Sequence, residues 1–88
     1  MKKVKAVDPI QKLLGILFEK SQEFSGLGWN RAQAKLREEL ARFGNNMSAA
    51  TDFLLEKFRE IRNHVGREIG RIEATIMVAD ILSFDPAI

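Results

Sequence analysis

The residue types that most often perform catalysis are scarce in this sequence. Its 88 residues include one histidine, His64, and neither cysteine nor tyrosine. His64 falls off the apolar stripe of a predicted helix, so we expect its side chain to face solvent, one turn from Glu60. A catalytic triad would need a nucleophile and an acid that converge on the imidazole, and a zinc site would need further ligands. We therefore predict no catalytic residue, no metal site and no cofactor.

The acidic residues fit a solvated helix surface better than general acid–base chemistry. Glu38 and Glu39 are adjacent on a predicted helix and therefore point in different directions. Glu56 and Glu60 share a face, and the basic residue Arg59 lies between them in the sequence. Because a proton-transferring pair needs a cleft, the sequence predicts a protein that is not an enzyme.

One group of residues has the chemistry of a docking surface. If the C-terminal half forms one helix, a rotation of about 100° per residue places most of this group opposite the apolar stripe. The group, called here the arginine–glycine set, consists of Arg59, Arg62, Asn63, Gly66, Arg67, Gly70 and Arg71. Gly66 and Gly70 would form a notch between guanidinium groups that suits a partner helix or a phosphate backbone. The alternative is a solvated face, since Glu60, Glu68 and Glu73 neutralise much of its charge.

A second candidate surface is the segment 74–84, which is apolar nearly all round rather than along one stripe. Enclosing such a helix completely is difficult in a chain of this length, and a large exposed apolar patch normally marks an interface. We predict that it forms an oligomer or partner interface, with simple burial as the alternative. The predicted interface residues are Ile76, Met77, Val78, Ile81, Leu82 and Phe84.

The charge distribution bears on the choice of partner. The formal net charge is +2, but Lys2, Lys3 and Lys5 lie at the N-terminus, and the other residues comprise 11 bases and 12 acids. A DNA-binding domain normally carries a basic excess on its folded body. We therefore predict a non-catalytic helical module for protein–protein interaction or self-assembly: a homo-oligomeric or filament-like subunit, or an adaptor that binds a partner's helices. The alternative is a small nucleic-acid-binding regulator that uses the arginine face and dimerises through the C-terminal helix.

The elements that position these residues are all predicted to be helices, over 9–24, 31–43 and 48–83. Leu36 to Leu54 carries an unbroken heptad seam typical of a coiled coil, yet Gly44-Asn45-Asn46 breaks helices. We predict a break or kink near 44–47. One continuous helix from residue 30 to residue 83 is the alternative.

The fold class that follows is all-α and oligomeric. A short N-terminal helix folds back on a long or kinked helix, as a helical hairpin or three-helix arrangement. We expect residues 1–7 to form a flexible basic tail, 8–84 a single domain and 85–88 a C-terminal tail. The predicted core consists of Leu14, Leu17, Phe18, Trp29, Leu40, Phe43, Leu54, Phe58, Ile61, Val65 and Ile72.

The sequence lacks an evident secretory signal or membrane span, so we expect a cytoplasmic protein, with export without a cleaved signal peptide as the alternative. In outline the chain resembles the small helical-hairpin proteins exported by type VII secretion, whose turn carries Trp-x-Gly. It is similar in size and hairpin plan to type III secretion needle subunits as well. Here the turn reads Trp29-Asn30-Arg31 and contains no proline, so no family is assigned.

Overall fold

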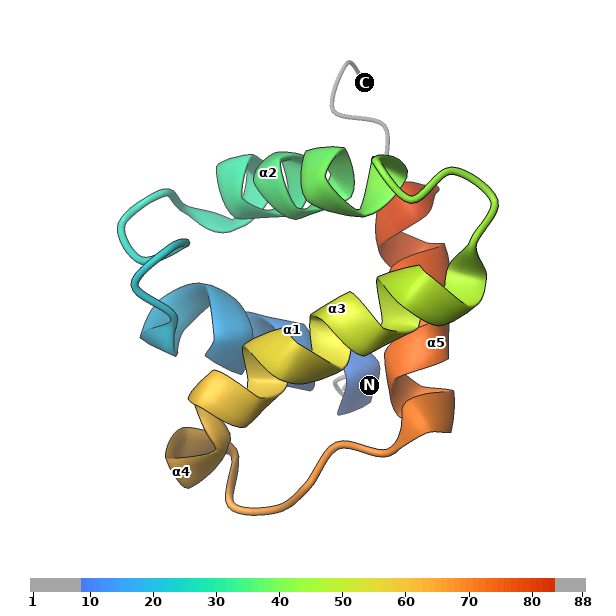
Figure 1. Ribbon diagram of the computed structural model, residues 1–88. Helices are drawn as coiled ribbons and strands as arrows, with labels where there is room; N and C mark the ends of the chain where they lie inside the picture. Colours follow the sequence, from blue (N-terminus) through green and yellow to red (C-terminus); the bar gives the residue numbers. More distant parts are fainter. Residues whose placement is uncertain (1–8, 84–88) are drawn as a thin grey trace, which may run out of the picture.

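The structure is a computed structural model that describes residues 9–83, and within them every regular element is a helix (Figure 1). In chain order the helices are α1 (Pro9–Lys20), α2 (Trp29–Ala41), α3 (Met47–Glu60), α4 (Arg62–Val65) and α5 (Arg71–Leu82). The predicted all-α class is confirmed. The predicted tails, 1–7 and 85–88, lie outside the described residues.

α1 ends before the predicted residue 24 because the chain turns at Ser21. The Ser21 carbonyl accepts the backbone N–H groups of Phe24 at 3.1 Å and Ser25 at 2.8 Å. Gly26 and Gly28 then adopt φ angles of 87° and 85°, which residues with a side chain rarely adopt. Phe24 is fully buried, so the turn itself contributes a side chain to the core.

The predicted break near residues 44–47 is confirmed. α2 ends at Ala41 and α3 begins at Met47, and Gly44 has a φ of 61° in the turn between them. The Asn46 side chain accepts the N–H of Ala49 at 3.0 Å and so caps α3. The two halves of the heptad seam therefore lie on different helices rather than along one.

The prediction of a continuous helix over 48–83 is wrong. α3 ends at Glu60, and the short α4 ends at Val65 and is followed by Gly66, whose φ of 88° is left-handed. Non-helical chain then leads to Gly70, the N-cap of α5. The Gly70 N–H donates to Glu73 Oε1 at 3.0 Å, which satisfies one of the free amides around the helix start. The two glycines that would have formed a helix notch instead end one helix and begin another.

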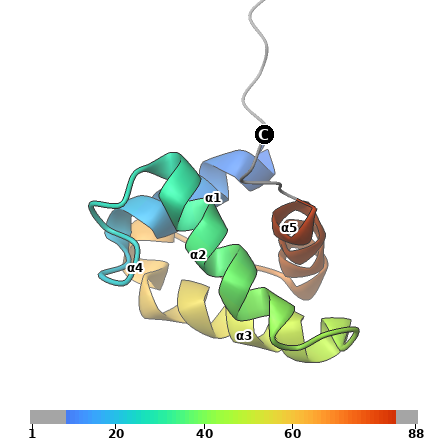
Figure 2. The ribbon, with the colours of Figure 1, turned by 90° about the horizontal axis from the view of Figure 1, so that it is seen from above.

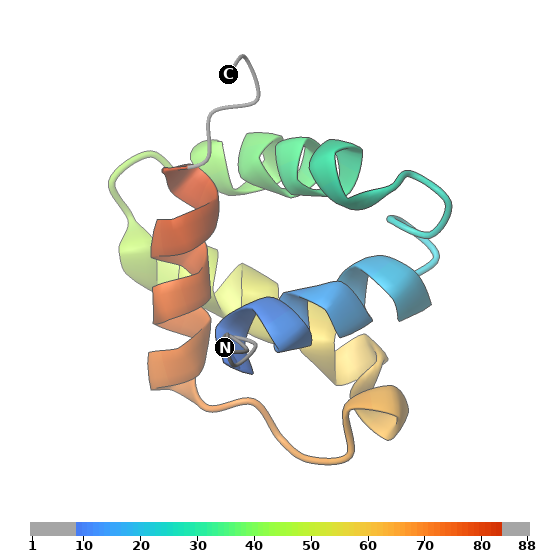
Figure 3. The same cartoon turned by 180° about the vertical axis from the view of Figure 1, so that it is seen from behind.

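α5 turns back across the other helices and completes the core. It packs mainly against α3 and α2 and also touches α1 (Figures 2 and 3). The hydroxyl oxygens of Thr51 in α3 and Thr75 in α5 lie 3.2 Å apart and share a hydrogen bond. Met77, Val78 and Ile81 are fully buried. One side of the apolar C-terminal helix is therefore enclosed by the chain itself.

Most of the predicted core is confirmed. The buried members are Leu14, Leu17, Phe18, Leu40, Leu54, Phe58 and Ile61. Phe43 and Val65 are half-buried against them. Trp29 and Ile72 are corrections, since their side chains are 41% and 79% exposed. Trp29 is the first residue of α2, which was predicted to begin at residue 31. Ile72 lies in the first turn of α5, which was predicted to be part of a longer helix. The predicted direction of each side chain was therefore wrong.

Charged side chains tie the turn after α1 to α2 and α3. Lys57 of α3 forms an ion pair with Glu23 of the turn, and its Nζ lies 3.6 Å from a carboxylate oxygen of Glu39 in α2. Lys35 contacts the same two carboxylates at 3.7 and 3.4 Å. Burial, together with the hydrogen bond to Glu23, raises the pKa of Glu39, whereas hydrogen bonds with Glu39 and Lys57 lower the pKa of Glu23. Two lysines thus hold two neighbouring carboxylates together across three segments.

Within residues 9–83, no helix combines the length and the apolar character that crossing a membrane requires.

Replacing Gly66 with alanine tests the break that places α5. Because Gly66 has a φ of 88°, Gly66→Ala should lower the free energy of unfolding by roughly 1–2 kcal/mol. Gly15→Ala is the matched control, because a Cβ there would meet only Trp29 Cζ3 at 3.8 Å. It should raise the free energy of unfolding by up to about 1 kcal/mol, since alanine favours the helix. Urea denaturation measured by circular dichroism reports both values, and shifts of the same sign would contradict this account.

Candidate functional site

The arginine–glycine set does not lie on one helix face. Arg59 is in α3, Arg62 and Asn63 are in α4, and Arg71 is the first residue of α5. The remaining members, Gly66, Arg67 and Gly70, belong to the non-helical connection between α4 and α5. The prediction of one arginine–glycine face is therefore wrong. It assumed a continuous helix through this region, and the left-handed turn at Gly66 ends that helix.

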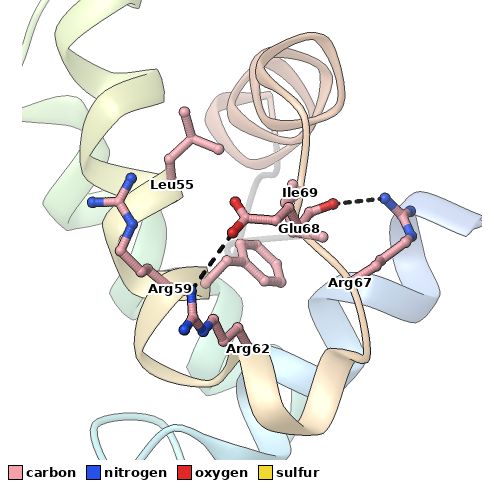
Figure 4. A pocket seen from close by; sticks show the side chains of 7 residues that line it. Leu55, Arg59, Arg62, Arg67, Glu68 and Ile69 are labelled. Carbon is pink, nitrogen blue, oxygen red and sulfur yellow. Dashed lines mark hydrogen bonds and ion pairs between the residues drawn. The ribbon is translucent and has the colours of Figure 1, made fainter.

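The connection nevertheless brings three of these arginines around a small cavity (Figure 4). The cavity measures about 90 Å³ and lies between α3, α4 and the chain that leads to α5. Its apolar lining consists of Leu55, Phe58 and Ile69, and its polar lining of Arg59, Arg62, Arg67 and Glu68. A cavity of this size has room for a few water molecules rather than a nucleotide.

Each arginine of the set has an acidic partner within the fold. Arg59 pairs with Glu56 one turn earlier, and Arg62 lies 3.6 Å from Glu68. These two pairs are well exposed, and pairs of this kind contribute little to stability.

Arg67 and Arg71 hold α5 in place. Arg67 donates two hydrogen bonds to the Glu73 carboxylate, at 2.9 and 2.6 Å, and a third to the Glu68 carbonyl at 3.0 Å. Arg71 donates to the Asp52 carboxylate and to the hydroxyl and carbonyl of Ser48. The guanidinium groups that were predicted to bind a ligand thus join α5 to the connection that precedes it and to α3.

Glu73 is the acidic residue with the largest perturbation among these pairs. The hydrogen bonds from Arg67, and then that from the Gly70 N–H, lower the pKa of Glu73 to about 2. Both favour the carboxylate over the acid. Glu73 is therefore a structural residue, since both its cap and its ion pair hold the start of α5.

The exposed side of α5 is the other candidate surface. Ile72, Ile76, Ala79 and Ser83 recur at helical spacing and are all exposed; they are called here the α5 outer face. The Ile72 side chain is 79% exposed and that of Ile76 is 45% exposed, the two largest exposures among the large apolar residues described. An exposed apolar pair one turn apart is the arrangement by which helices dock on each other.

The predicted interface residues divide between the two sides of α5. Ile76 lies on the outer face and Leu82 is half-buried at its edge. Met77, Val78 and Ile81 face the core and are fully buried; they can touch a partner only if the fold opens. Phe84 lies outside the described residues. The sequence pattern placed Ile72 in the core rather than on the surface, because the apolar spacing continues through Gly66 and Gly70 as if the helix did not end there.

His64 is exposed, as predicted. It lines an open hollow of about 620 Å³ at the end of α3, together with Glu60 and with Lys20 and Glu23 from the other wall. Among the residues that the structure describes, no group of three or more histidine or acidic side chains could hold a metal ion.

Comparison of the chain with protein-family models, with curated proteins and with solved structures finds no match.

The Glu73 ion pair predicts a specific dependence of stability on pH. A carboxyl group whose pKa falls from 4.5 to about 2 on folding adds stability above about pH 4.5 and loses it as the pH falls toward 2. The free energy of unfolding of the protein should therefore exceed that of Glu73→Gln by more at pH 5.5 than at pH 2.5. Both side chains of the pair are partly exposed, so the difference is small.

Urea denaturation at the two pH values measures this difference. Glu38→Gln is the control, because Glu38 is exposed and has no ion pair among the described residues. A Glu73→Gln curve parallel to that of the unaltered protein would show that the pair is not formed in solution.

Proposed function

We propose that this protein is a non-catalytic helical interaction module that self-associates through the α5 outer face. The observation that carries the proposal is the exposure of Ile72 and Ile76 on a helix whose opposite side is core. A partner's helices could use the same surface, which is the adaptor form of the proposal. The first occupant proposed is a second copy of this chain.

The composition of the α5 outer face supports close helix packing. Burying one isoleucine side chain contributes about 1.5–3 kcal/mol, and this face presents two of them in consecutive turns. Ala79 and Ser83 continue the face with small side chains, which allow the partner's backbone to approach closely. An isologous pairing of two such faces would bury all four isoleucines at once.

A chain of 88 residues also gains more from association than a large one. Small domains bury a smaller fraction of their surface and are correspondingly marginal in stability. The core of this chain draws on every long helix, so the monomer is expected to fold, and self-association adds to its stability by mass action.

The non-catalytic part of the proposal is supported by how the polar residues are used. The carboxylates with the clearest pKa shifts, Glu23, Glu39 and Glu73, are held by lysine or arginine side chains that join segments of the fold. His64 is exposed, and the hollow beside it is open to solvent. Neither arrangement provides the enclosed, water-poor site that acid–base chemistry favours.

The alternative function, a nucleic-acid-binding regulator, is the weaker proposal. It would need the arginines of the set to bind phosphates, and each of them is already paired with an acid of the same chain. The N-terminal lysines would then supply most of the binding charge.

Substituting Ile72 with aspartate tests self-association. Ile72→Asp should weaken it by at least about tenfold, since it removes more than 1.4 kcal/mol of apolar burial from each side chain. The substitution should leave the monomer folded, because an acidic residue in the first turn of a helix is favourable. Sedimentation velocity and light scattering over a concentration series measure the effect.

Asn30→Asp is the matched control for that experiment. Asn30 is also an exposed second residue of a helix, in α2, so the variant adds the same charge in the same helical position. It should associate like the unaltered protein. A single 10.0 kDa species at all concentrations, or equal association of both variants, would contradict the proposal.

The nucleic-acid alternative is tested by the salt dependence of binding. Gel-shift titrations with random duplex and single-stranded oligonucleotides at 50 and 200 mM salt should show no complex. Four to six phosphate contacts would instead give binding at 50 mM salt that weakens by roughly 10²-fold at 200 mM. That outcome would favour the regulator over the interaction module.

A further inference from the structure

A second hollow lies beside the C-terminal part of α1 and the turn that leads to α2. Figures 1 and 3 show that this end of α1 and the turn lie away from α5. The hollow is open to solvent and measures about 370 Å³. The residues that line it are Gly15, Phe18, Glu19, Gly26, Gly28 and Trp29. Half of these residues have no side chain, so much of the wall is bare backbone.

The indole of Trp29 forms the aromatic wall of this hollow. Its ring packs edge-on against Phe18, with centroids 5.2 Å apart and an interplanar angle of 72°. It also lies over Gly15, where a Cβ would be only 3.8 Å from Cζ3. Packing against Phe18 and Gly15 fixes the ring, yet 41% of Trp29 remains exposed. A large, rigid and exposed aromatic surface is typical of a binding residue.

Glu19 is the only ionisable residue in the lining. It is exposed, and within the described part of the chain it makes no ion pair. An aromatic ring beside a carboxylate is complementary to a cation, because the ring face and the carboxylate oxygens are both negative.

The same chain uses this combination inside its own fold. Lys57 Nζ lies 4.7 Å from the ring centroid of Phe53 and 5.8 Å from that of Phe24, and it pairs with Glu23. An ammonium group held between aromatic rings and a glutamate therefore joins α3 to the turn. At Trp29 and Glu19 the ring and the carboxylate are present, but no lysine or arginine among the described residues lies over the indole.

We propose that the hollow between α1 and the following turn binds a cationic side chain, lysine or arginine, of a partner polypeptide. The cation would lie against the Trp29 ring and pair with Glu19, and its aliphatic stem would cross the glycine backbone of the turn. Gly26 and Gly28 suit this role because they have no side chains and their positive φ angles disfavour any other residue there. The nearest basic residues on α1, Lys12 and Lys20, are not part of the lining. The site is separate from the α5 outer face, so it does not depend on self-association.

Trp29 itself reports binding, because the chain has one tryptophan and no tyrosine. The experiment titrates the full-length protein with the blocked tripeptides Gly-Arg-Gly, Gly-Lys-Gly and Gly-Gln-Gly, and with tetramethylammonium, and records tryptophan emission. The two basic peptides should give a saturable change at millimolar concentration, and the glutamine peptide should give none. If tetramethylammonium gives a saturable change and neither basic peptide does, the proposal is overturned, since the site would then bind a small free cation rather than a side chain.

Glu19→Gln should raise the half-saturation concentration for the basic peptides by at least about threefold, because it removes the charge and keeps the shape of the side chain. Glu38→Gln, an exposed glutamate on α2 outside the lining, should leave it unchanged. Circular dichroism confirms that both variants fold. No saturation by either basic peptide, an equal response to the glutamine peptide, or identical binding by Glu19→Gln and the unaltered protein would overturn the proposal.

Discussion

The arrangement of this protein depends on the left-handed turn at Gly66. With a φ of 88° the residue ends α4, and the chain reaches Gly70 without helical hydrogen bonds before α5 begins. Had the helix continued, Met77, Val78 and Ile81 would extend away from α1 and α2. Because it does not, these three side chains are fully buried in the core. The turn converts the most apolar segment of the chain into the helix that closes the core.

Electrostatic interactions secure that turn rather than form a ligand site. Arg67 binds Glu73 with two hydrogen bonds, and Arg71 reaches back to Asp52 and Ser48 at the start of α3. The start of α5 is thus held on both sides by guanidinium groups. Arginine suits this use because its planar fork matches a carboxylate in two hydrogen bonds at once. The positive charge of this region is consequently neutralised within the fold, which weakens the case for phosphate binding.

The two surfaces proposed for binding are formed by different elements of the structure. The α5 outer face is apolar and suits another helix, whereas the Trp29 hollow is mixed and suits a basic side chain. The hollow is lined by α1, the turn that follows it and the start of α2, and Figure 2 shows this turn on the side of the molecule away from α5. An assembly built through α5 would therefore leave the hollow of each copy free. The proposed module could therefore combine self-association with recognition of a second, basic polypeptide.

Local features of the sequence determined what is local. The spacing of the apolar residues determined the helical class and most of the buried residues, and the helix-breaking cluster Gly44-Asn45-Asn46 determined the break after α2. Leu14, Leu17, Leu40 and Leu54 are buried. Each lies within one helix, where the spacing of the apolar residues determines which side chains share the buried face. The exposure of His64 follows from the same spacing.

Tertiary structure alone decided where α5 lies and which of its sides is exposed. The apolar pattern continues through Gly66 and Gly70 without interruption, and a helix apolar nearly all round gives no direction for its buried side. Ile72 was assigned to the core and Ile81 to the surface, yet their exposures are 79% and 0%. The physical reason is that one left-handed residue changes the course of the backbone, and packing against α2 and α3 then selects the buried side. The carboxylate partner of Arg71 was likewise set by that turn, because Asp52 and Arg71 meet only after α5 has folded back.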